Sequence, residues 1–167
     1  AVAADAEAGE YNICINNGSR TVRYPYMFAA REEGSSDRTS FTTADFVYLI
    51  MPDRFANGDA SNDSTDDTAE KADRSKPGRR HGGDIKGIID HLDYIADLGA
   101  TAIWCTPLLL DDENGASYHG YSCSDYYHID PRYGDNELFR SYVEECHKRD
   151  LKVIMDIVPN HSSTSHW

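Results

Sequence analysis

Three short segments of the sequence combine residue types that can perform chemistry. The first covers residues 156–161 and reads DIVPNH, directly after an apolar run. It offers a carboxylate from Asp156, an amide from Asn160 and an imidazole from His161. Polar groups that end a buried strand need partners, so this combination forms a candidate site. The alternative is that Asp156 caps a helix or forms a salt bridge, and that His161 is a surface residue.

The second segment is rich in aromatic side chains, covers residues 118–127 and reads YHGYSCSDYY. Tyrosine rings can stack on the apolar faces of sugars, while His119 and Asp125 can hydrogen-bond sugar hydroxyls. The chain holds eleven tyrosines among 167 residues, which favours the same interpretation. The competing interpretation is that these rings pack against neighbouring elements, and the residue types alone leave both open.

The third segment supplies side-chain oxygens at close spacing. Residues 57–63 read NGDASND, and Asp84 closes the loop that follows. Such oxygens around a glycine-containing turn suit a hard cation such as calcium, which takes six to eight oxygen ligands. The spacing is not that of an EF-hand. A solvated acidic loop is the alternative, because Asn, Asp, Gly and Ser are ordinary turn residues.

The composition excludes several classes of partner and site. The net charge is −13, from 29 acidic and 16 basic residues, so nucleic acid is not expected as a partner. The charge fits a neutral substrate or a bound cation. No stretch approaches the ~20 apolar residues of a membrane-spanning helix. The four cysteines form no CxxC pair, which argues against zinc, and we expect Cys105 and Cys146 to be buried thiols.

Elements that would position the three segments follow a repeating pattern. Residues 46–51, 100–105 and 151–158 are apolar runs typical of strands covered on both faces. A helix is predicted over 84–98, with apolar residues at helical spacing, Asp84 as its N-cap and Gly99 just beyond its end. A second helix is predicted to begin after Asp135.

This β-α-β-α-β order predicts parallel strands joined by right-handed crossovers. An open doubly wound sheet and a (β/α)8 barrel both fit the pattern. In both, chemistry lies at the carboxyl ends of the strands, where the three segments fall. A Rossmann-type nucleotide site is not expected, since no glycine-rich turn directly follows a strand.

The N-terminal part has a different character. Tyr11, Ile13 and Ile15 alternate with polar residues, and Asn17 and Gly18 form a hairpin-type turn. A piece this small is not a stable sheet alone. We therefore expect residues 1–41 to be the end of a β domain, and residues 42–167 to belong to a separate α/β domain.

Residues 46–167 resemble the α-amylase family, glycoside hydrolase family 13. The resemblance rests on DIVPNH, on MPDRFANGD with SND, on GGDIKGIIDHLDYIADLGATAIWCTP and on YHGYSCSDYYHIDPRYGDNELF. These segments are similar to the neopullulanase and cyclomaltodextrinase branch. The resemblance implies an α/β fold: a partial (β/α)8 TIM barrel with its first three strands and two helices. It implies that a β-sandwich domain ends within residues 1–41 and that residues 42–167 begin the catalytic barrel.

The resemblance also implies roles for particular residues. His161 would hydrogen-bond the sugar on the non-reducing side of the cut bond, Tyr121 would stack on that sugar, and His119 would lie beside it. Asp156 would support the site by holding an arginine that orients the nucleophile. A structural calcium ion would be held by matching side chains and one carbonyl, those of Asn57, Asp59, Asn62, Asp63, Gly82 and Asp84.

The three acidic residues with which this family cuts have no counterpart in the chain. They lie near the ends of barrel strands four, five and seven, and a whole (β/α)8 barrel needs ~250 residues. We therefore expect an N-terminal fragment of the catalytic barrel, truncated after strand three, that is inactive alone.

The whole protein is expected to be a retaining glycoside hydrolase acting on α-1,4-glucans such as starch, maltodextrin, pullulan or cyclodextrin. The alternatives are a transglycosylase of the same family and a non-catalytic, amylase-like carbohydrate-binding protein. A homodimer is considered for the intact enzyme. The compartment stays open, with the periplasm slightly favoured over the cytosol.

Overall fold

The computed structural model describes residue 3 and residues 5–167. The chain divides into two compact units, Ala1–Ser40 and Phe41–Trp167. This division falls one residue from the predicted boundary between residues 41 and 42. Among the described residues, none of the helices has both the length and the apolar character needed to cross a bilayer.

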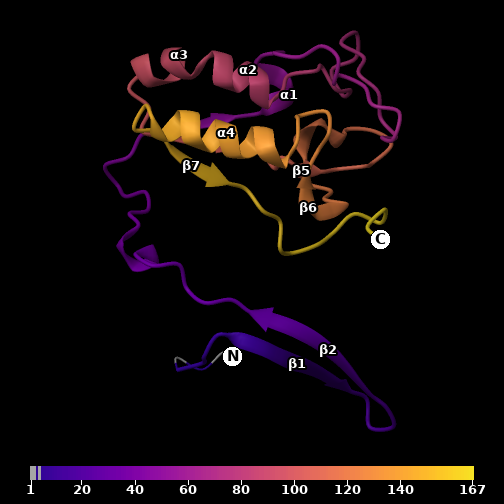
Figure 1. Ribbon diagram of the computed structural model, residues 1–167. Helices are drawn as coiled ribbons and strands as arrows, with labels where there is room; N and C mark the ends of the chain where they lie inside the picture. Colours follow the sequence, from indigo (N-terminus) through magenta and orange to yellow (C-terminus); the bar gives the residue numbers. More distant parts are fainter. Residues whose placement is uncertain (1–2, 4) are drawn as a thin grey trace. The chain divides into compact units, whose positions relative to one another are not determined.

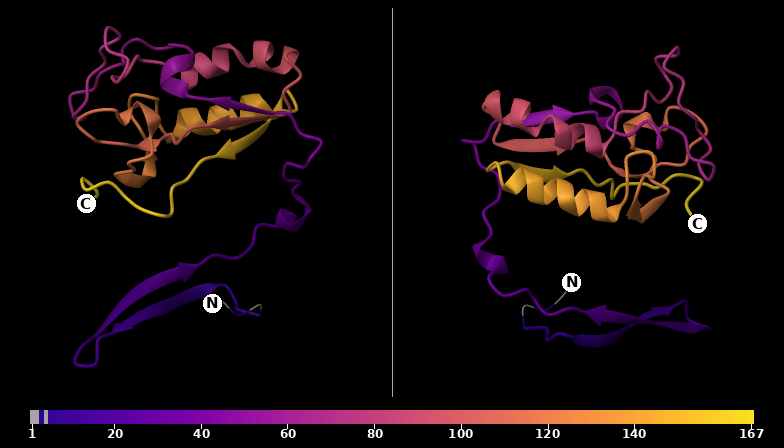
Figure 2. Two further views of the ribbon diagram at one scale, coloured as in Figure 1. Left: turned by 180° about the vertical axis from the view of Figure 1, so that it is seen from behind. Right: turned by 45° about the horizontal axis from the view of Figure 1, so that its top comes forward.

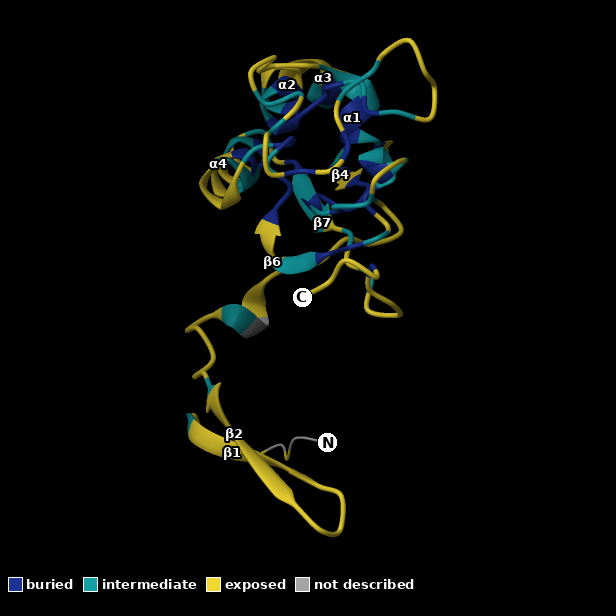
Figure 3. Cartoon of the chain, turned by 90° about the vertical axis from the view of Figure 1, so that its right-hand side faces the viewer, coloured by how far each residue is buried: buried dark blue, intermediate teal, exposed yellow. Residues whose placement is uncertain are grey.

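The first unit is an antiparallel hairpin of β1 (Gly9–Asn16) and β2 (Thr21–Phe28), followed by the short 3-10 helix η1 (Ser35–Asp37). The side chain of Asn17 shapes the turn by accepting backbone N–H groups of the next residues. Most of the hairpin is exposed (Figure 3). One face carries the apolar cross-strand pairs Tyr11–Tyr26, Ile13–Tyr24 and Ile15–Val22. Its assignment to a β-sandwich domain stays a prediction.

The second unit is built on a three-stranded parallel sheet (Figure 1). Its strands are β3 (Val47–Ile50), β4 (Ala102–Cys105) and β7 (Lys152–Met155), in that spatial order. They lie within the three predicted runs; β3 and β7 are shorter at both ends, and β4 starts later but ends at the predicted Cys105. Because the three strands are parallel and adjacent, their carboxyl ends lie together at the same edge of the sheet.

The helix predicted over 84–98 is divided, which corrects that prediction. The structure has α2 (Ile85–Asp90) and α3 (Leu92–Asp97), separated by His91 at φ −116° and ψ 13°. The His91 ring lies with Nδ1 2.8 Å from the carbonyl oxygen of Gly87, the acceptor that the regular helix would reserve for the His91 backbone N–H. The N-cap prediction for Asp84 is confirmed, since its side chain accepts from the N–H of Gly87.

The last helix, α4 (Asn136–His147), begins as predicted, because the Asp135 carboxylate accepts the N–H of Leu138 at 2.7 Å. It lies beside α2, and the two cover one face of the sheet (Figure 2). Cys105 and Cys146 are buried free thiols in this layer, as predicted. The core between helices and sheet includes Ile85, Ile88, Leu92, Ile95, Ile103, Tyr142 and Leu151. On the other sheet face Leu49 and Trp104 stay 56% and 37% exposed.

The loops after β3 and β4 carry structure that the sequence did not predict. A one-turn helix, α1 (Pro52–Phe55), follows β3 directly. After β4 come β5 (Leu109–Leu110), the 3-10 helix η2 (Ser117–His119) and β6 (Asp125–Ile129), with β5 and β6 antiparallel. These loops emerge at the carboxyl end of the sheet and build the candidate site.

Candidate functional site

Two of the three predicted segments meet beyond the ends of β4 and β7. Asp156 directly follows β7, and Tyr121 lies in the loop after β4. The Tyr121 hydroxyl donates a hydrogen bond to Asp156 Oδ2 at 3.0 Å, and the indole Nε1–H of Trp104 donates to the same oxygen at 3.1 Å. The Asp156 carboxylate, at the end of β7, therefore links the neighbouring strand β4 to the loop that follows β4.

The two histidines predicted for the site lie against the same tyrosine. His161 Nε2 is 2.9 Å from the backbone carbonyl oxygen of Tyr121, so this nitrogen carries the proton. His119 Nδ1 accepts the backbone N–H of Tyr121 at 2.9 Å, and the two rings lie 5.9 Å apart. The structure thus brings His119, Tyr121, Asp156 and His161 together. Tyr121 is 39% exposed and His161 is also exposed, so both are open to a ligand.

Burial and neighbouring carboxylates set the electrostatics of this cluster. Burial and the hydrogen bond to Asp156 raise the pKa of Tyr121, so its phenol remains a proton donor at neutral pH. Asp111 lies fully buried beneath the cluster, 3.9 Å from His119 Nδ1. Its pKa is raised by burial, against the opposing hydrogen bond from the Ser122 N–H.

The segment 116–121, here called the arch, presents His119 and Tyr121. Its backbone is unusual at two points. Ala116 has φ 61°, in the left-handed region, and η2 starts directly after it. Gly120 has φ 78°, and a Cβ there would lie 2.1 Å from the carbonyl oxygen of Pro107. The arch therefore packs closely against the segment that follows β4. A larger residue at position 120 would have to move the arch away from that segment.

A buried ionic network beneath the arch was missed at the sequence level. Asp130 receives Arg80 Nη1 at 3.1 Å and Arg132 Nη2 at 2.8 Å, and all three side chains are at most 1% exposed. Burial alone would raise the Asp130 pKa, but hydrogen bonds from Arg132 and the charge of Arg80 leave it lowered. Asp53 and Glu70, from the loop after β3, are buried beside them. The polar loop after β3 thus contributes buried charged side chains to a polar core.

The predicted calcium residues fall into two groups. In the first group, the carboxylates of Asp84 and Asp59 already accept hydrogen bonds from nearby residues. The Asp84 carboxylate accepts N–H groups from Gly58, Asp59 and Gly87 at 2.6–3.2 Å. Asp59 Oδ1 in turn accepts the N–H and the hydroxyl of Ser61. These contacts cap α2 and fix the start of the loop.

The second group converges on a small space. Asn57 Nδ2 lies 2.6 Å from Asp63 Oδ1, and a Cβ on Gly82 would lie 2.4 Å from that same oxygen. The Oδ1 atom of Asn62 is buried and has no hydrogen-bond partner in the described part of the chain. Across those described residues, no three His, Cys, Asp or Glu side chains gather closely enough to hold a metal. A hard cation prefers carboxylate and amide oxygens such as those of Asp63 and Asn62, whereas Asn57 directs its amide nitrogen at Asp63 here.

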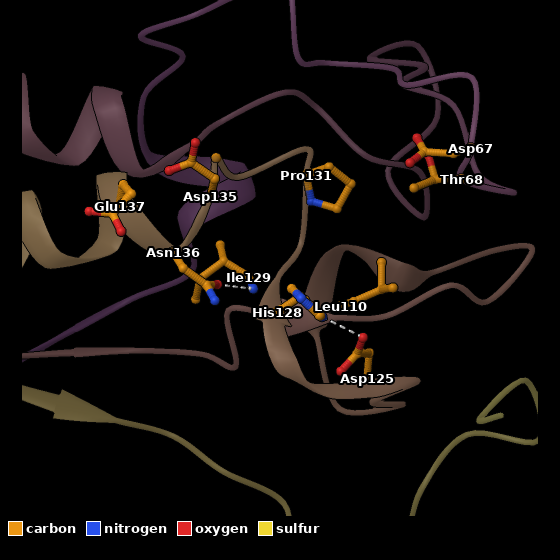
Figure 4. Close-up of a pocket in the computed structure, with 11 residues that line it drawn as sticks. Asp67, Thr68, Leu110, Asp125, His128, Ile129, Pro131, Asp135, Asn136 and Glu137 are labelled. Atoms are coloured by element: carbon orange, nitrogen blue, oxygen red, sulfur yellow. Dashed lines mark hydrogen bonds and ion pairs between the residues drawn. The ribbon is translucent and has the colours of Figure 1, made fainter.

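A separate pocket of about 510 Å³ lies between β6 and the start of α4 (Figure 4). Asp125 and His128 face each other on its wall, with His128 Nδ1 2.7 Å from Asp125 Oδ2. The residues of the Tyr121–Asp156 cluster do not line it. Asp125, whose side chain could bind sugar hydroxyls by its type, contacts His128 here.

Comparison with known proteins gives one consistent result. The family described as "Alpha amylase, catalytic domain" matches residues 49–167. Neopullulanase 2 of Thermoactinomyces vulgaris is 43% identical over 73% of this chain and 21% of its own length. Cyclomaltodextrinase of Thermoanaerobacter pseudethanolicus is 41% identical over 83% of this chain and 23% of its own length.

A solved structure extends this result to three dimensions. The cyclic α-maltosyl-(1→6)-maltose hydrolase of Arthrobacter globiformis, in complex with maltose, is 39% identical, with a TM-score of 0.63 over 74% of this chain and 27% of that one. This chain spans about a quarter of the length of the relatives it matches. It therefore belongs to the α-amylase family, glycoside hydrolase family 13, on the branch of the neopullulanases and cyclomaltodextrinases.

Proposed function

We propose that this chain is the first part of the catalytic barrel of a retaining glycoside hydrolase that acts on α-1,4-linked glucans. The observation that carries the proposal is the cluster of Tyr121, His161 and Asp156 at the carboxyl ends of parallel strands, the functional face of this fold class. The maltose held by the structurally similar Arthrobacter hydrolase supports a glucan as ligand.

In this proposal the chain supplies sugar binding and positioning. The exposed ring of Tyr121 stacks on a glucose face, held in place by its hydrogen bond to Asp156. The exposed His161 imidazole donates to a sugar hydroxyl in place of the Tyr121 carbonyl. Retaining hydrolysis needs a nucleophile and an acid/base carboxyl about 5–5.5 Å apart. Since the chain has no counterpart of the family's acidic residues, we expect it to be inactive alone.

We further propose that the loop after β3 holds a structural calcium ion. The buried Asn62 Oδ1, which has no hydrogen-bond partner among the described residues, and the closeness of Asn57, Asp63 and Gly82 support it. These residues, with Asp59 and Asp84, would hold the ion. When bound, it would neutralise the local carboxylates and tie the loop together.

Reducing-sugar release from soluble starch, pullulan and cyclodextrin tests the first proposal. We expect turnover by the full-length protein that contains these residues and none by residues 1–167. Turnover by residues 1–167 in a contamination-controlled preparation would refute the division of roles. Products longer than the substrate would point to glucan transfer, and absence of turnover by the full-length protein would point to a binding protein.

Calorimetric titration of the full-length protein with calcium tests the second proposal. We expect binding that the Asp59→Ala plus Asp63→Ala double variant abolishes. The exposed Asp66→Ala is a matched control in the same loop. No heat of binding, or equal binding by the double variant, would exclude this site.

A further inference from the structure

We infer that Glu70 is a positioning residue for the sugar-binding arch. The inference deepens the proposed function and rests on it for the identity of the ligand. Glu70 lies in the loop after β3, far along the chain from the arch, and its side chain is 1% exposed. A buried carboxylate in a surface loop is unusual unless it is paired or hydrogen-bonded, so its partners indicate its role.

The partners of Glu70 are the first residues of the arch. Oε2 accepts the N–H of Ser117 at 2.7 Å, and Oε1 accepts the N–H of Ala116 at 3.3 Å. Consecutive backbone N–H groups that point at one carboxylate fix the orientation of both peptide planes. Arg79 Nη1 lies 3.4 Å from Oε1, and Arg132 Nη1 donates to the Glu70 backbone carbonyl at 2.9 Å. Glu70 is thus itself held on both its side chain and its backbone.

The backbone at Ala116 explains why such an anchor is needed. Its φ of 61° is uncommon for a residue with a Cβ, and such a conformation persists only where the surroundings determine it. The carboxylate of Glu70 holds the N–H on each side of the Ala116 Cα. Without that carboxylate, two N–H groups lose their acceptor and the strained residue loses its restraint.

A short, stiff connection links this anchor to the sugar-facing side chains. Arg80 Nη1 lies 3.3 Å from Ser117 Oγ, and the hydroxyl of Tyr133 donates to the Tyr118 carbonyl at 2.8 Å. One residue further, His119 Nδ1 accepts the N–H of Tyr121. The backbone conformation at Ala116 therefore sets the positions of the His119 and Tyr121 rings. Glu70 does not itself reach the exposed site, so its contribution is positional.

The test uses the full-length protein and compares Glu70→Gln and Glu70→Ala with wild type. Glutamine keeps one acceptor oxygen at the same length, while alanine keeps none. Glu144→Gln is the matched control, because Glu144 is exposed on α4. We expect KM for maltooligosaccharides to rise about tenfold in Glu70→Ala and by less in Glu70→Gln, with kcat within twofold, because ground-state sugar binding is weakened. A loss of stability alone would lower the active fraction, and hence the apparent kcat, at unchanged KM.

Amide hydrogen exchange supplies a readout that does not depend on activity. We expect faster exchange in peptides covering 116–121 for both Glu70 variants, with α4 unchanged. If Glu70→Ala does not fold, Glu70→Gln decides alone. Unchanged exchange in the arch, or kinetics equal to those of Glu144→Gln, would overturn the inference. A wild-type protein without hydrolytic activity would instead refute the proposed function, while the exchange data would still decide whether Glu70 holds the arch.

Discussion

The hydroxyl of Tyr121 and the carboxylate of Asp156 are hydrogen-bonded at 3.0 Å although 35 residues separate them in sequence. The bond joins the loop after β4 to the end of β7, and Trp104 donates to the same carboxylate oxygen from β4. Asp156 therefore helps to orient the Tyr121 ring, which also lies against the His119 ring. The ring and the hydroxyl of Tyr121 have separable tasks, which substitutions can distinguish.

Replacing Tyr121 by phenylalanine should raise KM for maltooligosaccharides by only about threefold, because one hydrogen bond is lost and the ring remains. Tyr121→Ala should raise KM by about tenfold or more, because the stacking surface is lost. Steady-state kinetics of the full-length protein measures both. Tyr127→Ala is the control, since Tyr127 is 75% exposed and its backbone bonds to Asp125 and Asn136. Equal effects of Phe and Ala would assign the binding to the hydroxyl instead.

Replacing Asp130 by asparagine should lower the free energy of unfolding by about 3–5 kcal/mol, because two buried guanidinium groups lose their common counter-ion. Urea unfolding measures the change. Asp90→Asn removes an exposed partner of Lys86 and should cost at most about 1 kcal/mol. A similar small cost for both variants would show that the network relaxes or admits water.

Asp45 should make folding stability depend on acid pH. Hydrogen bonds from Lys152, from the Thr42 N–H and from Thr101 lower its pKa from 3.8 to about 2. A lowered folded-state pKa stabilises the fold above the unfolded pKa, and that contribution is lost as pH falls from about 4 to about 2. The melting temperature of Asp45→Asn should therefore lie below that of wild type at pH 6, and the two should converge towards pH 2. A constant difference across this range would contradict the assignment.

Thiol modification should distinguish the cysteines of the folded protein. Burial raises the pKa of Cys105 and of Cys146 to about 12, and it raises that of Cys123 as well, whereas Cys14 is exposed. Because the thiolate is the nucleophile, one thiol of these four should react with a maleimide at pH 7 and all four should react in urea. Mass spectrometry counts the adducts. Rapid labelling of Cys105 or Cys146 in the native protein would show that the helix–sheet layer opens.

Sequence reasoning succeeded where the signal is local. Asp84 and Asp135 were predicted as helix caps because a cap needs only its own next few residues, and both bonds are present. The break at His91 was missed, since the apolar spacing continues through it. There a side chain competes with the backbone for the Gly87 carbonyl, and hydrophobic periodicity carries no information on such competition.

The same distinction applies to the candidate site. Tyr121, His161 and Asp156 could be grouped in advance because each follows the carboxyl end of a strand, and those ends meet in a parallel sheet. Glu70 and Asp130 could not, because the arch partners of Glu70 and the Arg80 partner of Asp130 lie in another loop, and loop-to-loop pairing has no sequence period. A buried charge in a loop looks like a solvated one until its distant partner is known.

The two arginine partners of Asp130 lie at very different distances along the chain, two residues away for Arg132 and 50 for Arg80. The near pair can form as soon as its own turn does, whereas the far pair must first close a long loop, at an entropic cost that grows with loop length. We therefore expect the loop over residues 53–83 to form its native contacts late during folding. Mutations there should speed unfolding more than they slow folding. Pulse-labelled hydrogen exchange would record this order as later protection of the Ser117 amide, which Glu70 holds, than of the Leu138 amide at the start of α4.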